Sequence, residues 1–244
     1  MNYLIGIDLG TSSTKTVLFD EKGEVIASAS KDYPLYTPHN GWAEQKPEDW
    51  RDAALETITK VAVVEGIQEL VPEETREKVA GMSFGGQMHG LVMLDEQGEV
   101  IRPSIIWCDQ RTEKECEEMT EKVGAEKLIE ITANPAMTGF TASKILWVRN
   151  NEPENYAKCK HILLPKDYVR YILTGEFATE VSDASGMQLL DVPKRQWSDE
   201  LLEILDIDKS LLAKVYESPE VTGTILPEIA AKTGLSTSTV VVGG

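Results

Sequence analysis

The sequence predicts an α/β fold in which one domain combines a mixed sheet with inserted helices. Two observations carry this prediction. Over residues 1–30, short apolar runs alternate with turn residues, as in consecutive β-strands. After Arg111, apolar residues recur at the spacing of three to four that is typical of amphipathic helices. No linker rich in proline and serine separates these regions, so we expect a single domain over 1–244.

The N-terminal part is expected to form strands and turns. Three antiparallel strands come first, at 3–9, 15–19 and 24–30. Pro47 then begins a helix that reaches about Val64 and has one apolar face. The next elements are a strand at 77–84, the glycine-rich turn GGQMHG, a hairpin at 91–101 and a short strand at 104–109.

The C-terminal part is expected to be mainly helical. Its helices are predicted at 111–124, 141–151, 166–175, 198–207 and 226–234, with short strands at 161–165 and 240–242. Thr141 is the predicted N-cap of its helix, because a threonine hydroxyl can accept from an amide of the first turn. Gly124, Gly175 and Gly234 are predicted to end their helices, because glycine readily adopts the left-handed conformation of a C-terminal cap.

One heptapeptide occurs twice, as DEKGEVI at 20–26 and as DEQGEVI at 95–101. A single recurrence is not a repeat array. We interpret both copies as hairpin turns that need a glycine at positive φ, rather than as parts of a duplicated unit.

Composition and charge exclude several classes of partner. The net charge of −17 disfavours nucleic acid and anionic membranes, because both repel an acidic surface. The N-terminus lacks a basic leader, and its apolar run ends at Asp8, so we expect no signal peptide. No apolar stretch reaches the ~20 residues that span a bilayer. The three cysteines cannot all pair and form no C-x-x-C motif, so we expect reduced thiols in a cytoplasmic protein.

The segment IGIDLGTSSTK, at 5–15, predicts a site for a phosphate and a metal ion. Asp8 ends a strand, where a carboxylate can hold a hydrated divalent ion such as Mg²⁺. The turn after it offers backbone amides and hydroxyls to a phosphate, and Lys15 adds a positive charge. The turn residues are Gly10, Thr11, Ser12 and Ser13. The alternative is that Asp8 only caps the turn; the chain has no Walker A sequence, which disfavours a P-loop fold.

The segment SFGGQMHGL, at 83–91, predicts one wall of a sugar-sized pocket. Its glycines allow the backbone to approach a ligand closely. Gln87 and His89 offer the directional hydrogen bonds that sugar hydroxyls require, and Met88 offers an apolar contact. The alternative for His89 is a core histidine with its hydrogen bonds satisfied.

The segment IIWCDQRT, at 105–112, predicts a second wall. The indole of Trp107 can lie on the C–H face of a sugar, although core packing is the usual role of a lone tryptophan. Asp109 and Arg111 can bind hydroxyls or pair with each other. Asp183, in the segment EVSDASGM, is interpreted as the cap of an Asx turn.

A metal-and-phosphate site beside a sugar-sized pocket suits phosphoryl transfer from ATP. The segments IGIDLGTSSTK, GGQMHG, WCDQRT, LLPKDYVRYILTGEFATEVSDASGMQLLDV and RQWSDELL together closely resemble the FGGY carbohydrate kinase family, over the whole chain. Members of this family phosphorylate glycerol, ribulose, gluconate or fuculose. The Met-His pair after the glycines is similar to the members that phosphorylate D-xylulose.

The resemblance implies an actin-like, ribonuclease H-like ATPase fold. Two such domains would flank a cleft, with the sugar deep in the N-terminal domain and ATP mostly on the C-terminal one. It implies that Asp8 acts in catalysis through Mg²⁺ and the transferred phosphate, and that Met88 and His89 contact the sugar. Roles for Gln87, Trp107, Asp109 and Asp183 follow less directly.

The resemblance also implies that the strand ending in VVVGG continues to an aspartate that acts as general base. We therefore expect residues 1–244 to be the N-terminal, sugar-binding half of a kinase, inactive without its C-terminal domain. Surface that this domain would cover then favours self-association, for instance as a homodimer.

Three other functions stay open at this stage. The first is a kinase for another ketose, a polyol or a sugar acid. The second is a non-catalytic actin-like domain, which has no need of the polar pocket formed by GGQMHG and WCDQR. The third is a sugar sensor or a partner-binding module.

Overall fold

The computed structural model of the chain describes residues 2–62 and 79–244. Within these residues, six strands form the main sheet in the order β13-β14-β5-β1-β2-β3. The strands are β1 (Tyr3–Leu9), β2 (Ser13–Asp20), β3 (Val25–Asp32), β5 (Val79–Gly86), β13 (Val221–Thr224) and β14 (Val240–Val242). β1, β2 and β3 are antiparallel, whereas β5 runs parallel to β1 and to β14. The predicted mixed sheet is therefore confirmed.

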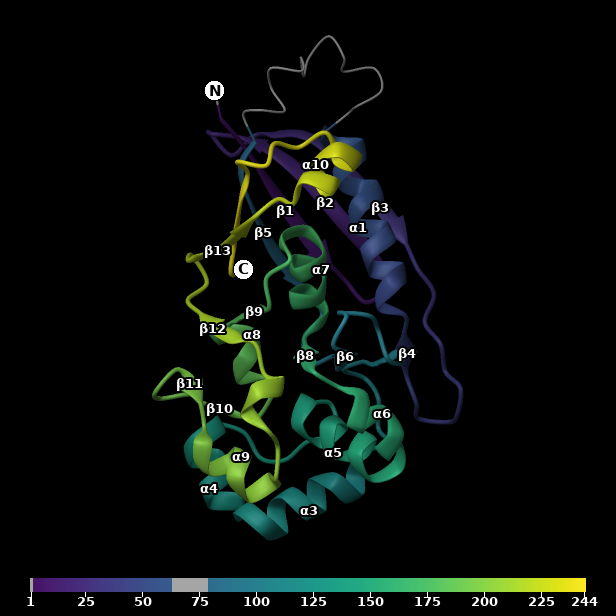
Figure 1. Cartoon of the computed structure of the whole chain (residues 1–244), viewed down its shortest axis with the longest axis vertical. Helices are drawn as coiled ribbons and strands as arrows, with labels where there is room; N and C mark the ends of the chain where they lie inside the picture. Colours follow the sequence, from purple (N-terminus) through teal and green to yellow (C-terminus); the bar gives the residue numbers. More distant parts are fainter. Residues whose placement is uncertain (1, 63–78) are drawn as a thin grey trace.

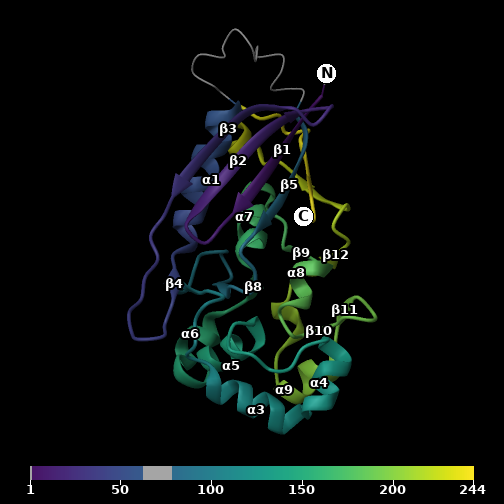
Figure 2. The same cartoon turned by 180° about the vertical axis from the view of Figure 1, so that it is seen from behind.

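Three helices cover one face of this sheet. They are α1 (Pro47–Ala62), α7 (Pro165–Thr174) and α10 (Pro227–Thr233), which pack against the sheet and around one another (Figure 1). Alternation along β1 selects the covered face, because Ile5, Ile7 and Leu9 are buried while Asp8 is exposed. Seen from behind, β3, β2, β1 and β5 lie in front of α1, so the outer face that carries Asp8 is accessible (Figure 2).

The other end of the molecule consists of shorter elements around a second hydrophobic cluster. Its helices are α3 (Glu113–Val123), α4 (Ala125–Thr132), α5 (Thr141–Asn151), α6 (Pro153–Lys158), α8 (Val181–Ser185), α9 (Asp199–Leu205) and the 3-10 helix η1 (Lys209–Leu211). Short paired strands connect them: β4 (Glu44–Gln45), β6 (Val92–Leu94), β7 (Ser104–Ile105), β8 (His161–Leu163), β9 (Ala178–Glu180), β10 (Leu190–Asp191), β11 (Gln196–Trp197) and β12 (Lys214–Tyr216). Helix α5 lies in this cluster with Ile145 and Leu146 fully buried.

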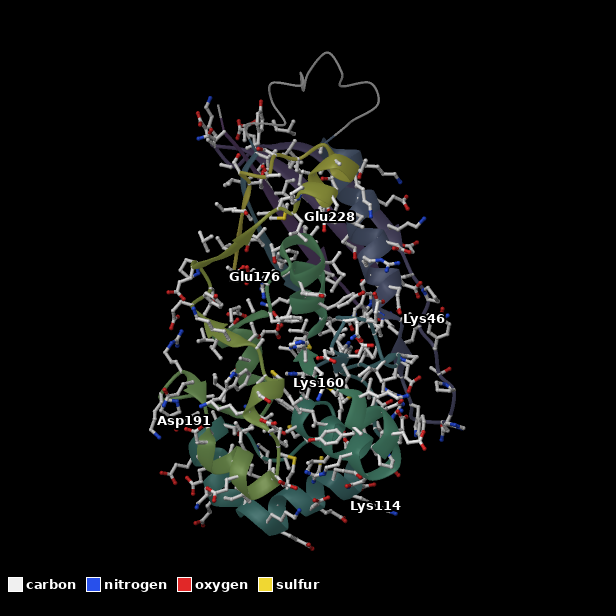
Figure 3. All side chains as sticks on the ribbon, viewed as in Figure 1. Lys46, Lys114, Lys160, Glu176, Asp191 and Glu228 are labelled. Carbon is white, nitrogen blue, oxygen red and sulfur yellow. The ribbon has the colours of Figure 1, made fainter. Side chains whose placement is uncertain are left out.

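Charged side chains such as Lys46, Lys114 and Glu228 are exposed on the outside of the molecule (Figure 3). In the part of the chain that the structure describes, no helix combines the length and the apolar character needed to cross a membrane.

Most predicted helix ends are confirmed, and two local predictions are wrong. Gly124, Gly175 and Gly234 have positive φ and end α3, α7 and α10. Thr141 is the first helical residue of α5 rather than its N-cap, because its hydroxyl donates across to the carbonyl of His89. The strand predicted at 104–109 is extended only over Ser104–Ile105, since the chain turns where the Asp109 amide donates to Ile106. The predicted helix end at Val64 and the first two residues of the strand at 77–84 lie outside the described residues.

The two copies of the heptapeptide form the same turn. In each copy the aspartate Oδ1 accepts from two backbone amides at 2.9 Å: Asp20 from Lys22 and Glu24, and Asp95 from Gln97 and Glu99. The glycines, Gly23 and Gly98, have φ of 83° and 79°. The prediction that both positions need a glycine at positive φ is confirmed.

Gly23→Ala and Gly98→Ala test this turn as a matched pair. Each variant places a Cβ on a left-handed residue, at a cost of about 1–2 kcal/mol. At Gly23 no atom lies within 4 Å of the added Cβ, whereas at Gly98 the Cβ collides with the hydroxyl of Tyr171. The Tyr171 ring is stacked on Phe177 and cannot move aside freely. In urea unfolding we expect Gly23→Ala to lower the free energy of unfolding only by this conformational cost. Gly98→Ala should lower it clearly more, because of the added collision.

Tyr171→Phe serves as the control, because it removes the oxygen with which the Cβ collides. In the Tyr171→Phe background, Gly98→Ala should lower the free energy of unfolding by less than it does in the unmodified chain. Equal decreases for Gly23→Ala and Gly98→Ala in the unmodified chain would contradict this account.

Candidate functional site

The ends of two parallel strands bring the predicted turns together. Leu9 at the end of β1 is the register partner of Gly86 at the end of β5, and Asp8 is the partner of Gly85. The Gln87 amide extends the pairing by donating to the Leu9 carbonyl at 2.7 Å. The β1 turn (Gly10–Ser13) and the β5 turn (Gln87–Gly90) therefore lie side by side at one edge of the sheet.

A buried pair of amide side chains connects these two turns. Gln45 Nε2 donates to the Thr11 carbonyl at 2.7 Å, and Gln45 Oε1 accepts from Gln87 Nε2 at 2.9 Å. Trp50 Nε1 donates to the same Oε1 at 3.2 Å, which fixes the orientation of the Gln45 amide. Gln87 is itself buried, and within the described residues its Oε1 has no hydrogen-bond partner. Gln87 thus holds the site together from behind.

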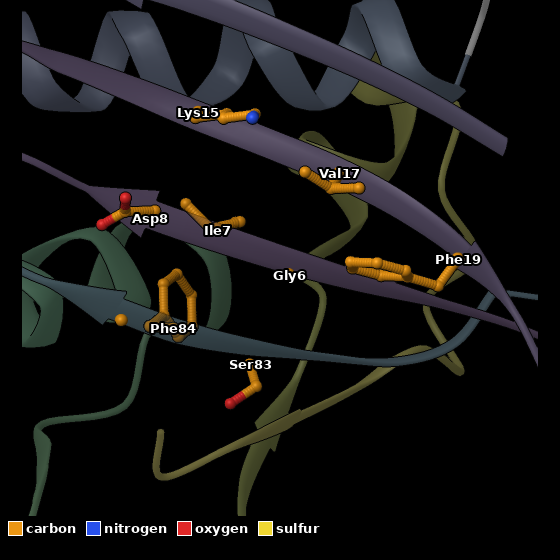
Figure 4. A pocket seen from close by; sticks show the side chains of 9 residues that line it. Gly6, Ile7, Asp8, Lys15, Val17, Phe19, Ser83 and Phe84 are labelled. Carbon is orange, nitrogen blue, oxygen red and sulfur yellow. The ribbon is translucent and has the colours of Figure 1, made fainter. Parts of the chain in front are cut away.

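Asp8 and Lys15 lie on the open outer face of the sheet. They are cross-strand partners in the register of β1 and β2, and both are exposed. Together with β5 they line a hollow of about 400 Å³ (Figure 4). The space over Gly85, the register partner of Asp8, is open, because a Cβ there would meet nothing within 4 Å. A carboxylate and an ammonium group thus border one hollow beside the β1 turn.

Side chains from three segments hold the β1 turn. The hydroxyl of Tyr33 donates to the Gly10 carbonyl, and Gln45 holds the Thr11 carbonyl. Trp107 Nε1 donates to the Thr11 hydroxyl oxygen at 3.0 Å. Trp107 is 42% exposed, so the interpretation as a core tryptophan is wrong. Its indole lies against the β1 turn and is accessible to a ligand.

His89 is held in an uncommon conformation on the β5 turn. Its φ is 65°, in the left-handed region that residues other than glycine rarely occupy. His89 Nδ1 lies 3.0 Å from the Gly186 carbonyl, which can only accept, so Nδ1 carries a proton and donates. The ring also packs against Phe140, with 4.3 Å between ring centroids. The neighbouring Met88 side chain is 41% exposed.

The imidazole of His89 is neutral at physiological pH. Burial, and secondly the positive charge of Lys144, lower its pKa to about 4. Because Nδ1 holds the one proton of the neutral ring, Nε2 is left as a hydrogen-bond acceptor.

Asp109 and Arg111 pair with each other, which is one of the two uses predicted for them. Asp109 is fully buried, and its carboxylate accepts from Arg111 Nη2 at 2.7 Å and from the Ala43 amide at 2.6 Å. Arg111 Nη1 also donates to Glu44 at 2.8 Å, and its guanidinium lies 3.7 Å from the ring centre of Trp42. Because these partners occupy the carboxylate, Asp109 supports the Trp107 loop instead of facing a ligand.

A buried ionic cluster lies where β14 ends. Lys166 Nζ donates to Glu180 at 2.7 Å and is 3.8 Å from Asp183. The interpretation of Asp183 as a cap is wrong, because Glu180 accepts from the first amides of α8 while Asp183 lies within that helix. Burial raises the pKa of Asp183 to about 7, and Lys166 opposes the shift. A Cβ on Gly244 would lie 3.0 Å from Lys166 Nζ, so this cluster adjoins the final glycines.

Several residues of the site carry no signal in the sequence. Gln45, Tyr33 and Lys166 act through contacts with segments that are distant along the chain, and a lone glutamine, tyrosine or lysine marks nothing by itself. By contrast, Asp8 and the Met88–His89 pair stand in recognisable turns.

The donor set for a metal ion is small. Among residues 2–62 and 79–244, no group of three or more His, Cys, Asp and Glu side chains is arranged to hold a metal ion. Asp8 offers a single accessible carboxylate, which suits an ion that takes most of its ligands from water and phosphate oxygens. All three cysteines are free thiols.

Comparison with known proteins gives close relatives over the whole chain. The "Xylulose kinase" of Lactococcus lactis is 44% identical over 244 residues, which is 100% of this chain and 47% of that protein. The crystal structure of a "xyloylose kinase" from Brucella ovis superposes with a TM-score of 0.89 at 36% identity, covering 100% of this chain and 48% of the other. A gluconate kinase structure from Lactobacillus acidophilus superposes with a TM-score of 0.89 at 30% identity, covering 100% and 47%.

These likenesses confirm the actin-like, ribonuclease H-like fold that the motifs imply. The chain spans about half the length of the curated relatives it matches. The N-terminal domain model of one family matches residues 3–244. This chain therefore belongs to the FGGY family of carbohydrate kinases.

Proposed function

We propose that residues 1–244 form the sugar-binding N-terminal domain of a kinase that transfers the γ-phosphoryl group of ATP to D-xylulose, giving xylulose 5-phosphate. The observation that carries the proposal is the side-by-side placement of the β1 turn and the β5 turn. One turn adjoins the carboxylate of Asp8 and the ammonium of Lys15, and the other presents Met88 and His89. The similarity to the Lactococcus lactis xylulose kinase supports D-xylulose as the acceptor.

The proposed sugar site combines apolar contact with directional hydrogen bonding. Trp107 and Met88 are both partly exposed and suit the C–H surface of a sugar. His89 Nε2, as an unprotonated nitrogen, accepts from a sugar hydroxyl. Gln87 and Asp109 position the turns that carry these groups.

The proposed phosphate site lies at the β1 turn and on the outer face of the sheet. Thr11, Ser12 and Ser13 supply amides and hydroxyls, and Lys15 supplies positive charge. The Gly10 amide closes the turn by donating to the Ser13 carbonyl at 3.0 Å. Asp8 is the residue that would hold Mg²⁺, which when bound neutralises charge on the phosphates. The chain's own contribution is to orient the phosphates beside the sugar.

We further propose that the remaining half of the kinase supplies the general base and most of the nucleotide contacts. Loss of a general base alone lowers the rate by about 10²–10⁴-fold, so we expect this chain by itself to turn over little or no sugar. We expect the reaction to take place in the cytoplasm, where ATP is available as the phosphoryl donor.

The acceptor could instead be a sugar acid, since a gluconate kinase shares the fold at 30% identity. The side chains that face the proposed site argue for an uncharged acceptor. Met88 and Trp107 are neutral, and so is His89 with its lowered pKa. The carboxylate of a sugar acid that bound against these side chains would lose its hydration without gaining contact with a cation.

Calorimetric titration of the chain with D-xylulose, ribulose, glycerol and gluconate tests this proposal. We expect D-xylulose to bind most tightly and His89→Ala to abolish its binding, because the acceptor Nε2 is lost. His161→Ala is the matched control: His161 stacks on Phe177 at the start of β8 and should leave the affinity unchanged.

Tighter binding of gluconate or glycerol would reject D-xylulose as the acceptor. Unchanged affinity in His89→Ala would remove His89 from the site, and no binding of any of the four ligands would reject a sugar-binding domain.

The pH dependence of D-xylulose binding tests the protonation state of His89. A histidine with the ordinary pKa of about 6.5 would be half protonated at that pH, and Nε2 would cease to accept. Because the pKa of His89 is lowered to about 4, we expect no loss of affinity from pH 7 down to about pH 5.5 and a fall below that. Circular dichroism at each pH controls for unfolding. A twofold loss of affinity between pH 7 and pH 6 would contradict the neutral-histidine account.

A further inference from the structure

The backbone of His89 is held by donors from a different part of the chain. Its carbonyl accepts from the Thr141 hydroxyl at 3.1 Å and from Lys144 Nζ at 2.9 Å. Both donors lie on α5, more than fifty residues further along the chain, with sequence separations of 52 and 55. A left-handed histidine costs conformational energy and persists only where its surroundings hold it.

Lys144 also holds the opposite wall of the site. It is fully buried, and its Nζ donates to the Gly139 carbonyl at 2.7 Å. Gly139 packs tightly against the Trp107 loop, because a Cβ on it would lie 2.9 Å from the Trp107 carbonyl. One ammonium group therefore connects the backbone of His89 with the segment that backs Trp107.

Burying a lysine side chain at this position costs free energy, because the charged group is removed from water. Its acceptors at these distances are carbonyl oxygens rather than carboxylates. The charged and titratable groups that influence it are Asp109, Cys108 and Arg111 from the Trp107 loop, and His89 from the β5 turn. Burial lowers the pKa of Lys144 to about 7, although Asp109 opposes this shift. An apolar side chain would fill the same space without the cost of removing a charge from water.

We propose that Lys144 is a positioning residue for sugar binding, which holds the His89 and Gly139 carbonyls so that the His89 imidazole and the Trp107 indole keep their places around the acceptor. This inference rests on the proposed function. Lys144 does not itself touch the sugar; it acts through the backbone of the residues that do.

Lys144→Met tests the proposal, because methionine fills the space but lacks the charge and the donors. We expect D-xylulose affinity to fall at least about tenfold, the range for hydrogen bonds to a charged group. In the same variant, without sugar, the pKa of His89 measured by NMR should rise from its low value, because a neighbouring positive charge is gone. A lysine that only stabilised the core would leave the D-xylulose affinity of the folded variant unchanged.

Two further variants separate the positioning of the His89 backbone from the effect of the Lys144 charge. Thr141→Val removes the other donor to the His89 carbonyl and should weaken D-xylulose binding about threefold without moving the pKa of His89. It also tests the proposal if Lys144→Met fails to fold. Lys122→Met, on the exposed face of α3, is the matched control and should change neither quantity.

Wild-type affinity in folded Lys144→Met would overturn the proposal, as would wild-type affinity in Thr141→Val. If the unmodified chain binds no D-xylulose, the proposed function fails instead. The NMR titration of His89 then reports only on the charge that Lys144 places near the imidazole.

Discussion

The arrangement of the site depends on the parallel pairing of β1 with β5. Their last residues, Leu9 and Gly86, are register partners, and a Cβ on Gly86 would lie 2.6 Å from the Leu9 carbonyl. Only a glycine lets the strands end this close together. The two turns that follow then leave the sheet at the same edge, so groups suited to phosphate and groups suited to sugar meet although 77 residues separate Gly10 from Gln87.

Buried polar contacts then hold the turns that this pairing brings together. The Gln45–Gln87 pair crosses between the turns, and the Asp109–Arg111 pair fastens the loop of Trp107. Removing one partner from such a contact leaves a buried group without its hydrogen bond, which costs more than the contact itself contributes. The exposed residues of the site therefore owe their positions to side chains that no ligand can reach.

The sequence was informative where a feature depends on neighbouring residues. Short strands, and helices that end at a glycine, can be predicted from local conformational preferences. Asp8 and His89 can be recognised as candidate site residues because they stand in distinctive turns. Features that depend on distant contacts were not accessible: α6 and α8 are too short to show an apolar period, and nothing local marks Gln45. For Asp109 the sequence left two uses open, binding a hydroxyl or pairing with Arg111, because it does not reveal that the carboxylate oxygens already have partners.

The recurring heptapeptide shows how a short match between two segments should be interpreted. One copy joins two long strands of the main sheet, and the other follows the short strand β6 in a different part of the fold. Their surroundings share little, since one glycine faces open space and the other is pressed against a tyrosine. Common ancestry is therefore not needed to explain the likeness, because an identical local geometry is enough. Similar heptapeptides can arise independently wherever a chain must reverse its direction in the same way.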